Sequence, residues 1–178
     1  MKERLSGLLR WVLVGLAVLL MVRSASRGCS TLPEVGSAAS GFSLPDARGG
    51  GSWSLEGFKG APVALVFFAT WCPSCRDELP ELAKAIVDRP GMKVLLLSDE
   101  DAKHVGNWLN GHGYAIPAAG RAGQVWRAYG VNVVPSVVVI GAEGDVVYAG
   151  QGGSSLTKAL ALLAERTTRV PAVTGERY

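Results

Sequence analysis

The segment "FFATWCPSCRDELP" (67–80) carries two cysteines, Cys72 and Cys75, separated by two residues. They fall where an apolar run gives way to a charged, helix-like stretch, so we expect both at the start of a helix. Unpaired N–H groups and the helix dipole favour negative charge there, and Pro73 suits the first helical position. Because a thiolate attacks disulfides, the spacing predicts thiol–disulfide exchange, with Cys72 as the exposed attacker and Cys75 as the resolving thiol.

Two other interpretations of the cysteine pair are weaker. A zinc site would need two more ligands, and the remaining candidates, Cys29, His104 and His112, are scattered along the chain. We assign the two histidines no role. A purely structural disulfide is possible outside the cytoplasm, but so short a loop gives little stabilisation. We therefore expect no metal and no cofactor other than a redox-active Cys72–Cys75 disulfide.

The N-terminal segment, residues 1–27, differs in composition from the rest. It holds five basic residues and one acidic residue around the apolar run "WVLVGLAVLLMV". This run is short for a spanning helix, which needs about 20 apolar residues, and is typical of a signal-peptide core. Counted from Leu5 it is longer, and Arg10 could reach the headgroups. A retained signal-anchor, a cleaved signal peptide and, as the weakest alternative, lipidation at Cys29 remain open, and all three place the following residues outside the cytoplasm.

Length and charge limit what the remaining residues form. The 178 residues suffice for one domain with a core and an appendage. The net charge of +3 comes from residues 1–27, and beyond them acidic and basic residues nearly balance. A nucleic-acid-binding face needs clustered basic residues, so we expect no nucleic-acid partner.

The elements around the cysteines alternate between strands and helices. Residues 28–41 are small and polar, typical of a flexible tether, residues 42–166 form the folded domain, and residues 167–178 are expected to be a loose tail. Apolar runs predict strands at 62–69, 92–98, 135–140 and 146–149, after a short hairpin at "FSL" and "WSL". Helical spacing predicts a helix after the cysteines, with an apolar face formed by Leu79, Leu82, Ala83, Ile86 and Val87. Further helices are predicted after "DED" (99–101), at 122–129 and from Ser154 or Ser155, where a hydroxyl can cap the free N–H groups. The pattern indicates a layered α/β domain.

The cysteine segment resembles the active-site segment of thioredoxin-fold proteins, especially the membrane-tethered TlpA/ResA/CcmG-type thiol–disulfide oxidoreductases. The resemblance covers most of residues 42–165, including "FSLPD", "WSLEGFKGAPVALVFFATWCPSC" and "YGVNVVPSVVVIGAEGDVVYAG". It implies a thioredoxin fold, in which helices flank a central mixed β-sheet, with an N-terminal membrane segment. It also implies a bacterial inner-membrane protein with its domain facing the periplasm, or a protein cleaved and secreted there.

The resemblance assigns further site residues. Pro135 corresponds to the cis-proline whose loop faces the cysteine pair, and Val134 to the residue that offers its backbone to an extended substrate. Pro135 precedes an apolar strand, and a cis X–Pro bond is the usual device for a tight approach there. Trp71 corresponds to an aromatic residue that flanks the site, although a partly buried core position is the simpler interpretation.

Glu78 is the candidate acid. It lies three residues after Cys75, so the two share a helix face, and it aligns with the acid of ResA- and CcmG-type proteins. Classical thioredoxins carry an acid where Val66 stands here. A half-buried carboxyl beside the thiols would have a raised pKa and could shuttle a proton to the leaving Cys75 thiolate. The alternative is a solvated glutamate.

The resemblance implies a reductant. Client proteins with a disulfide, such as apocytochrome c or another envelope protein, would be reduced, and a membrane electron donor of the thiol–disulfide type would restore the pair. Ser136 stands where CcmG-type proteins carry an acid. "LLLSDEDAKHVGNWL" resembles MauD-type proteins, so the alternative is a maturation factor or chaperone for one disulfide-rich envelope enzyme. A copper carrier that uses Cys72 and Cys75 is a third possibility, but no methionine or histidine lies near the motif to support it.

Overall fold

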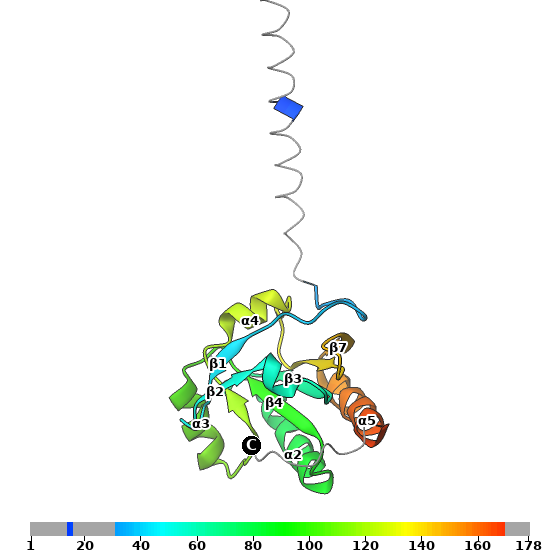
Figure 1. The fold of residues 1–178 in the computed structure, drawn as a ribbon. Helices are drawn as coiled ribbons and strands as arrows, with labels where there is room; N and C mark the ends of the chain where they lie inside the picture. The colour runs from blue at the N-terminus through cyan, green and yellow to red at the C-terminus, as the bar shows by residue number, and fades with distance from the viewer. Residues whose placement is uncertain (1–13, 16–30, 170–178) are drawn as a thin grey trace, which may run out of the picture. The chain divides into compact units, whose positions relative to one another are not determined.

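The computed structural model describes residues 14–15 and 31–169 (Figure 1). The chain separates into two units, Met1–Ser30 and Thr31–Tyr178. Apart from Val14 and Gly15, the predicted membrane segment lies outside the described residues. Within the described parts of the chain, no helix combines the length and apolar character needed to cross a bilayer.

A mixed five-stranded sheet forms the centre of the second unit, in the order β5-β4-β3-β6-β7. Its strands are β3 (Val63–Phe67), β4 (Lys93–Leu97), β5 (Ala118–Ala119), β6 (Ser136–Ile140) and β7 (Val146–Gln151). β4 is parallel to both β3 and β5, whereas β6 is antiparallel to both β3 and β7. The predicted α/β fold with a central mixed sheet is confirmed, and the two-residue strand β5 is an addition.

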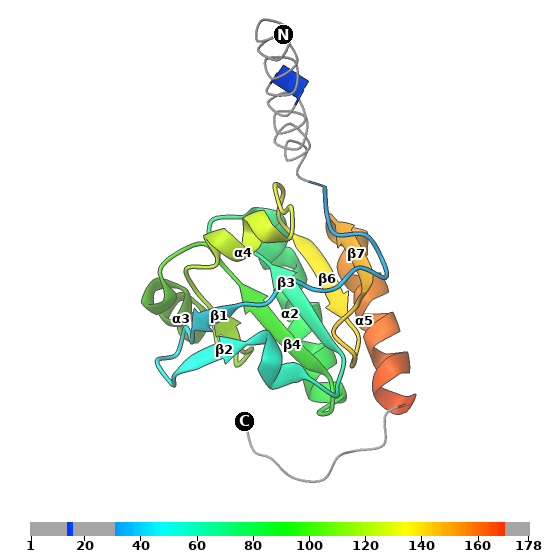
Figure 2. The ribbon, with the colours of Figure 1, turned by 45° about the horizontal axis from the view of Figure 1, so that its top comes forward.

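Helices and a hairpin cover the sheet. The helices are α2 (Pro73–Asp88), α3 (Ala102–Gly111), α4 (Gly123–Ala128) and α5 (Gly153–Arg169), with a 3₁₀ turn η1 (Leu55–Phe58) and the antiparallel hairpin of β1 (Ser43–Pro45) and β2 (Ser52–Ser54). Figure 2 shows the hairpin in front of the sheet and α2 behind it.

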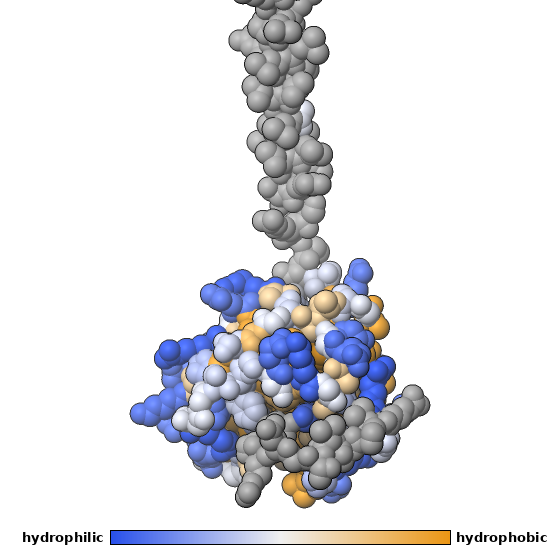
Figure 3. Space-filling model, in the orientation of Figure 1, coloured by the Kyte–Doolittle hydropathy of each residue, from blue (hydrophilic) through white to orange (hydrophobic). Residues whose placement is uncertain are grey.

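The strands are buried on both faces, as their continuous apolar runs predict. Successive side chains of β3 alternate between two cores. Ala64 and Val66 pack in a core that α2, α3 and α5 also line. Val63, Leu65 and Phe67 pack in the core of the opposite face, with residues of α4, η1 and β1. Hydrophilic side chains predominate on the outer face seen in Figure 3.

Two helix details differ from the prediction. Leu79 and Leu82 of α2 are buried as expected, but Val87 is 77% exposed. At about 100° per residue, Val87 lies roughly 80° around the helix from Leu79, beyond the face that packs on the sheet. α5 begins at Gly153, and the Ser155 hydroxyl donates to Gln151 O at 2.6 Å instead of capping an N–H group.

Part of the predicted tether lies against the domain. Gly36 N–H donates to Val146 O at 2.7 Å, Ala39 N–H to Gly144 O at 2.9 Å, and Val146 N–H to Ser37 O at 2.8 Å. Residues 36–39 therefore extend the sheet beside the start of β7. At the other end, α5 continues three residues beyond the predicted boundary at 166, to Arg169, and residues 170–178 lie outside the described residues.

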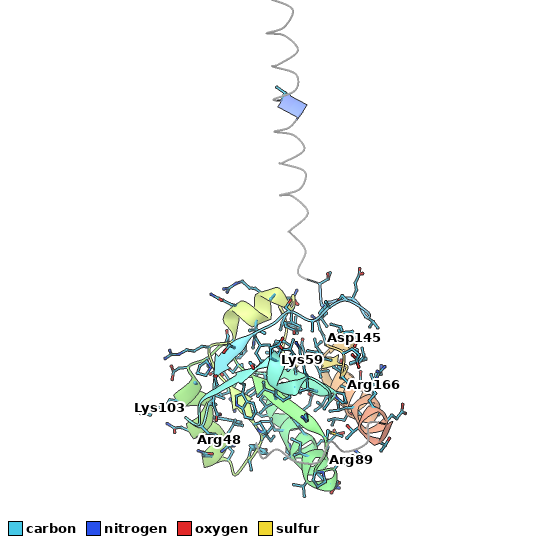
Figure 4. All side chains as sticks on the ribbon, viewed as in Figure 1. Arg48, Lys59, Arg89, Lys103, Asp145 and Arg166 are labelled. Atoms are coloured by element: carbon cyan, nitrogen blue, oxygen red, sulfur yellow. A yellow bond between two sulfur atoms is a disulfide. The ribbon has the colours of Figure 1, made fainter. Side chains whose placement is uncertain are left out.

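The hairpin docks on α3 and on the segment that follows it. Arg48, labelled in Figure 4, donates from Nη2 to Tyr114 O at 2.5 Å and to Ile116 O at 3.3 Å. Gly106 of α3 lies against the hairpin backbone, because a Cβ placed on it would be 1.9 Å from Ala47 O. The hairpin can therefore approach α3 this closely only because residue 106 is a glycine.

We expect Gly106→Ala to lower the free energy of unfolding by about 1–3 kcal/mol, because the added methyl forces the hairpin off α3. The matched control is Gly111→Ala at the end of the same helix, where a Cβ meets nothing within 4 Å. Alanine there should raise the free energy of unfolding by at most about 0.5–1 kcal/mol, because it has a higher helix propensity than glycine. Urea unfolding measures both, and equal stabilities of the two variants would contradict the close contact.

Candidate active site

The cysteine pair lies at the start of α2. Cys72 is the N-cap residue in an extended conformation, and Pro73 occupies the first helical turn. Cys75 N–H donates to Cys72 Sγ at 3.2 Å, and the two sulfurs form a disulfide between Cα atoms 5.3 Å apart. The predicted placement of both cysteines is confirmed. A helix N–H directed at a sulfur stabilises negative charge on it when the disulfide opens.

Both cysteines are enclosed, although Cys72 was expected to be exposed. Cys72 is 4% exposed and Cys75 is 3% exposed, so the prediction of an exposed Cys72 is wrong for this oxidised form. The Ser74 side chain lies over the sulfur, with Oγ 3.4 Å from Cys72 Sγ. Val134 O, in the loop before β6, lies 3.7 Å from the same sulfur. The loop before β6 thus covers Cys72, which sequence spacing alone does not reveal.

That loop contains the predicted cis-proline. The Val134–Pro135 peptide bond is cis, which confirms the conformation expected from the resemblance. β6 follows at once and pairs with β3, so that Ser136 lies opposite Phe67. Because β3 leads into the cysteine motif, this register brings Pro135 beside it. The Pro135 carbonyl accepts a hydrogen bond from Gly152 N–H at 2.9 Å, which ties the loop to the end of β7.

Two exposed apolar residues belong to the cysteine motif and the cis-proline loop. Trp71 is 62% exposed, so it is not the partly buried core residue of the simpler interpretation. Val133, in the cis-proline loop, is 53% exposed and was missed by the sequence analysis. The sequence feature that could have identified Val133 is its position in "VNVVP", two residues before Pro135. That Trp71, Val134 and Pro135 bind substrate remains a prediction.

Glu78 extends from α2 toward the same loop. It is half-buried and lines a small pocket with Val66, Pro135 and Ser155. Its Oε1 is buried with no hydrogen-bond partner among the described residues. Burial, with a smaller contribution from the Glu81 charge, raises the pKa of Glu78. The predicted half-buried carboxyl with a raised pKa is confirmed, and it shares a pocket with Val66, where classical thioredoxins carry an acid.

A second acid near the motif was missed. Glu100, expected only as part of the acidic start of a helix, accepts hydrogen bonds from Thr70 in the motif loop. Asp101 is the residue that caps α3, where its side chain accepts from Lys103 N–H at 3.0 Å. His104 contacts Glu100 and Thr70, whereas His112 stacks on Trp108 with ring centroids 4.1 Å apart. No feature of the sequence distinguishes Glu100 from its acidic neighbours.

Comparison with known proteins gives consistent matches. The sequence profile of the Redoxin family matches residues 34–163. The thiol-disulfide oxidoreductase ResA of Bacillus anthracis is 31% identical over 118 residues, 64% of this chain and 68% of that protein. The thiol:disulfide interchange protein DsbE of Vibrio cholerae is 34% identical over 141 residues, 74% of each chain.

A solved structure supports the same similarity. The exposed lipoprotein thioredoxin Etrx1 of Streptococcus pneumoniae superposes with a TM-score of 0.59 and 26% sequence identity. The match covers 69% of this chain and 99% of that one.

Proposed function

Because this chain belongs to the Redoxin family and is a thiol–disulfide oxidoreductase, we propose that it reduces disulfides of client proteins outside the cytoplasm. The observation that carries the proposal is the Cys72–Cys75 disulfide at the cap of α2, with the Cys75 N–H directed at Cys72 Sγ. The clients proposed are envelope proteins such as apocytochrome c.

The reduced protein starts the reaction. The Cys72 thiolate attacks one sulfur of the client disulfide, a mixed disulfide forms, and the other client sulfur leaves as a thiolate that takes up a proton. The Cys75 thiolate then attacks Cys72 Sγ. This forms the intramolecular disulfide and releases the second client thiol. Two electrons pass to the client, and a membrane electron donor of the thiol–disulfide type returns them to the cysteine pair.

Glu78 is proposed to move the proton of Cys75. The Cys75 thiol must lose its proton before it attacks, and the thiolate must regain one when the donor restores the dithiol. Glu78 lies one turn further along the same face of α2. A carboxyl whose pKa is raised toward that of its partner transfers protons more effectively near neutral pH.

Substrate binding is proposed at the surface around the cis-proline loop. The exposed side chains of Trp71, next to Cys72 in the chain, and Val133, in the cis-proline loop, offer apolar contact to a client. A client segment in extended conformation would lie across Val134 and Pro135, and its disulfide would displace the loop contact at Cys72.

The location rests on the N-terminal sequence. Residues 1–27 combine basic residues with an apolar run, which supports a single-pass anchor in a bacterial inner membrane or a cleaved signal peptide. Both leave the domain in the periplasm, an oxidising compartment.

Trapping with Cys75→Ser tests the proposed function. Without the resolving thiol, we expect mixed disulfides between Cys72 and client proteins to accumulate, and non-reducing electrophoresis followed by mass spectrometry identifies them. The matched control is the Cys72→Ser/Cys75→Ser double variant, which should trap nothing.

The trapped set and the redox equilibrium decide between the alternatives. Several trapped envelope proteins and general reduction of insulin support the reductase, whereas one trapped enzyme with negligible insulin reduction favours a maturation factor. Equilibration of the pair against glutathione tests the direction. A reduction potential of about −120 mV, the strongly oxidising end of the range for thiol–disulfide proteins, would show that the protein oxidises its clients.

A further inference from the structure

A largely buried acid lies behind the cysteine motif. Glu100 follows β4, and both oxygens of its carboxylate accept hydrogen bonds from Thr70, two residues before Cys72. The Thr70 N–H donates to Glu100 Oε2 at 2.7 Å, and the Thr70 hydroxyl donates to Oε1 at 2.6 Å. Thr70 is 5% exposed, and the Glu100 side chain is 17% exposed. Hydrogen bonds to a carboxylate are about twice as strong as neutral ones.

The register of two parallel strands explains why these residues meet. Phe67 at the end of β3 pairs with Leu97 at the end of β4, and Phe68 N–H donates to Leu97 O at 3.1 Å. Thr70 and Glu100 each lie three residues beyond the pair. Since parallel strands end at the same edge of the sheet, equal offsets bring the two residues together.

Three further side chains hold this contact. The Ser98 hydroxyl donates to Glu100 Oε2 at 3.0 Å, and Ser98 is 0% exposed. His104 Nε2 lies 3.5 Å from Glu100 Oε1 and 3.2 Å from Thr70 Oγ1. Arg76, in the first turn of α2, donates from Nε to Thr70 O at 2.8 Å. The N–H, hydroxyl and carbonyl of Thr70 thus all form hydrogen bonds. These bonds hold the loop to Glu100, which follows β4, and to Arg76 of α2.

The held loop determines where the attacking sulfur lies. Cys72 N–H donates to Ala69 O at 3.1 Å and closes a turn that contains Thr70. The same turn places Cys72 Sγ 3.2 Å from the Cys75 N–H, the contact that stabilises a thiolate. We propose that Glu100 is a positioning residue for the exchange reaction, because by holding Thr70 it keeps Cys72 at the cap of α2. The inference rests on the thiol chemistry of the site and on no particular client.

Glu100→Gln tests the proposal. Glutamine keeps the size but is neutral, so the hydrogen bonds from Thr70 lose their charge assistance and the loop is held less firmly. We expect the reduced variant to react with iodoacetamide at Cys72 about three- to tenfold more slowly at mildly acidic pH, the range that one hydrogen bond of ordinary net strength represents. Because the reduced form then loses thiolate stabilisation, equilibration with glutathione should shift toward the oxidised protein by a similar factor.

A pair of substitutions at Thr70 tests the same contact from its other partner. Thr70→Ser keeps the hydroxyl and should retain the wild-type alkylation profile. Thr70→Val replaces the hydroxyl with a methyl group and should slow alkylation in the same direction as Glu100→Gln. Glu143→Gln is the matched glutamate control, because Glu143 is exposed in the turn between β6 and β7, at the opposite edge of the sheet. It should leave both readouts unchanged.

Thermal unfolding of every variant separates positioning from a merely structural role. If Glu100→Gln lowers the melting temperature but leaves the alkylation rate and the glutathione equilibrium of the folded protein unchanged, the proposal is overturned. If that variant does not fold, the Thr70 pair decides, and equal alkylation profiles for serine and valine overturn the proposal. Because these measurements use no client, their failure is distinct from a failure of the Cys75→Ser trap.

Discussion

Cys72→Ser is expected to lower the rate of disulfide exchange by more than about 1,000-fold, because a serine hydroxyl is far too weak an acid to supply the attacking anion. Cys75 cannot replace it. Cys75 lies inside the first turn of α2, whereas Cys72 is the cap residue and lies beside the cis-proline loop. Insulin reduction and the reduction of a trapped client measure the loss.

The control for this variant is Cys29→Ser, which removes the chain's third cysteine and should leave the exchange rate unchanged. Circular dichroism should show an unchanged fold for Cys72→Ser, since the lost disulfide closes only a short loop. If Cys72→Ser retains exchange while Cys75→Ser abolishes it without trapping a client, the two cysteines have the reverse roles.

Glu78→Gln is expected to lower the exchange rate about 100-fold near neutral pH, the lower limit of what a positioned acid–base group contributes. In the wild-type protein, Glu78 accepts the Cys75 proton only when it is ionised. The rate of the resolving step should therefore fall as the pH drops through the raised pKa of Glu78. The variant should lack this inflection, which stopped-flow measurement of tryptophan fluorescence over a pH series detects.

The same substitution gives a stability prediction with a definite sign. Burial and the Glu81 charge raise the pKa of Glu78 above its usual value of 4.5, so the folded state favours the protonated form. The resulting stabilisation is complete below pH 4.5 and is lost as the pH rises through the raised pKa. Relative to wild type, Glu78→Gln should therefore gain stability over that window, and denaturant unfolding at several pH values measures it.

Glu81→Gln is the matched control for Glu78. Glu81 is exposed, and its Oε1 accepts a hydrogen bond from Thr157 Oγ1 at 3.4 Å, which a glutamine oxygen can still accept. Removing its charge should lower the pKa of Glu78 but keep the exchange rate within about twofold. An inflection of the resolving step that persists in Glu78→Gln would assign the proton transfer to another group.

The sequence determined those features that depend on neighbouring residues. Cys72, Pro73 and the apolar face with Leu79 predicted a cysteine pair at a helix start, because capping and helical periodicity act within a few residues. The apolar runs of β3, β4 and β6 predicted buried strands for the same reason. The family resemblance added the cis conformation at Pro135 and the partial burial of Glu78, which local periodicity alone does not give.

Only the tertiary structure decided what surrounds the sulfur. Val134 covers Cys72 because β6 pairs with β3 in a particular register, and Glu100 holds Thr70 because β4 lies parallel to β3 with equal offsets. Both contacts join residues some thirty or more positions apart. Many pairings of strands are compatible with the same apolar runs, and a shift of register would move both partners away from the motif. The reactive residues are thus encoded locally, whereas their positioning is a property of the assembled sheet.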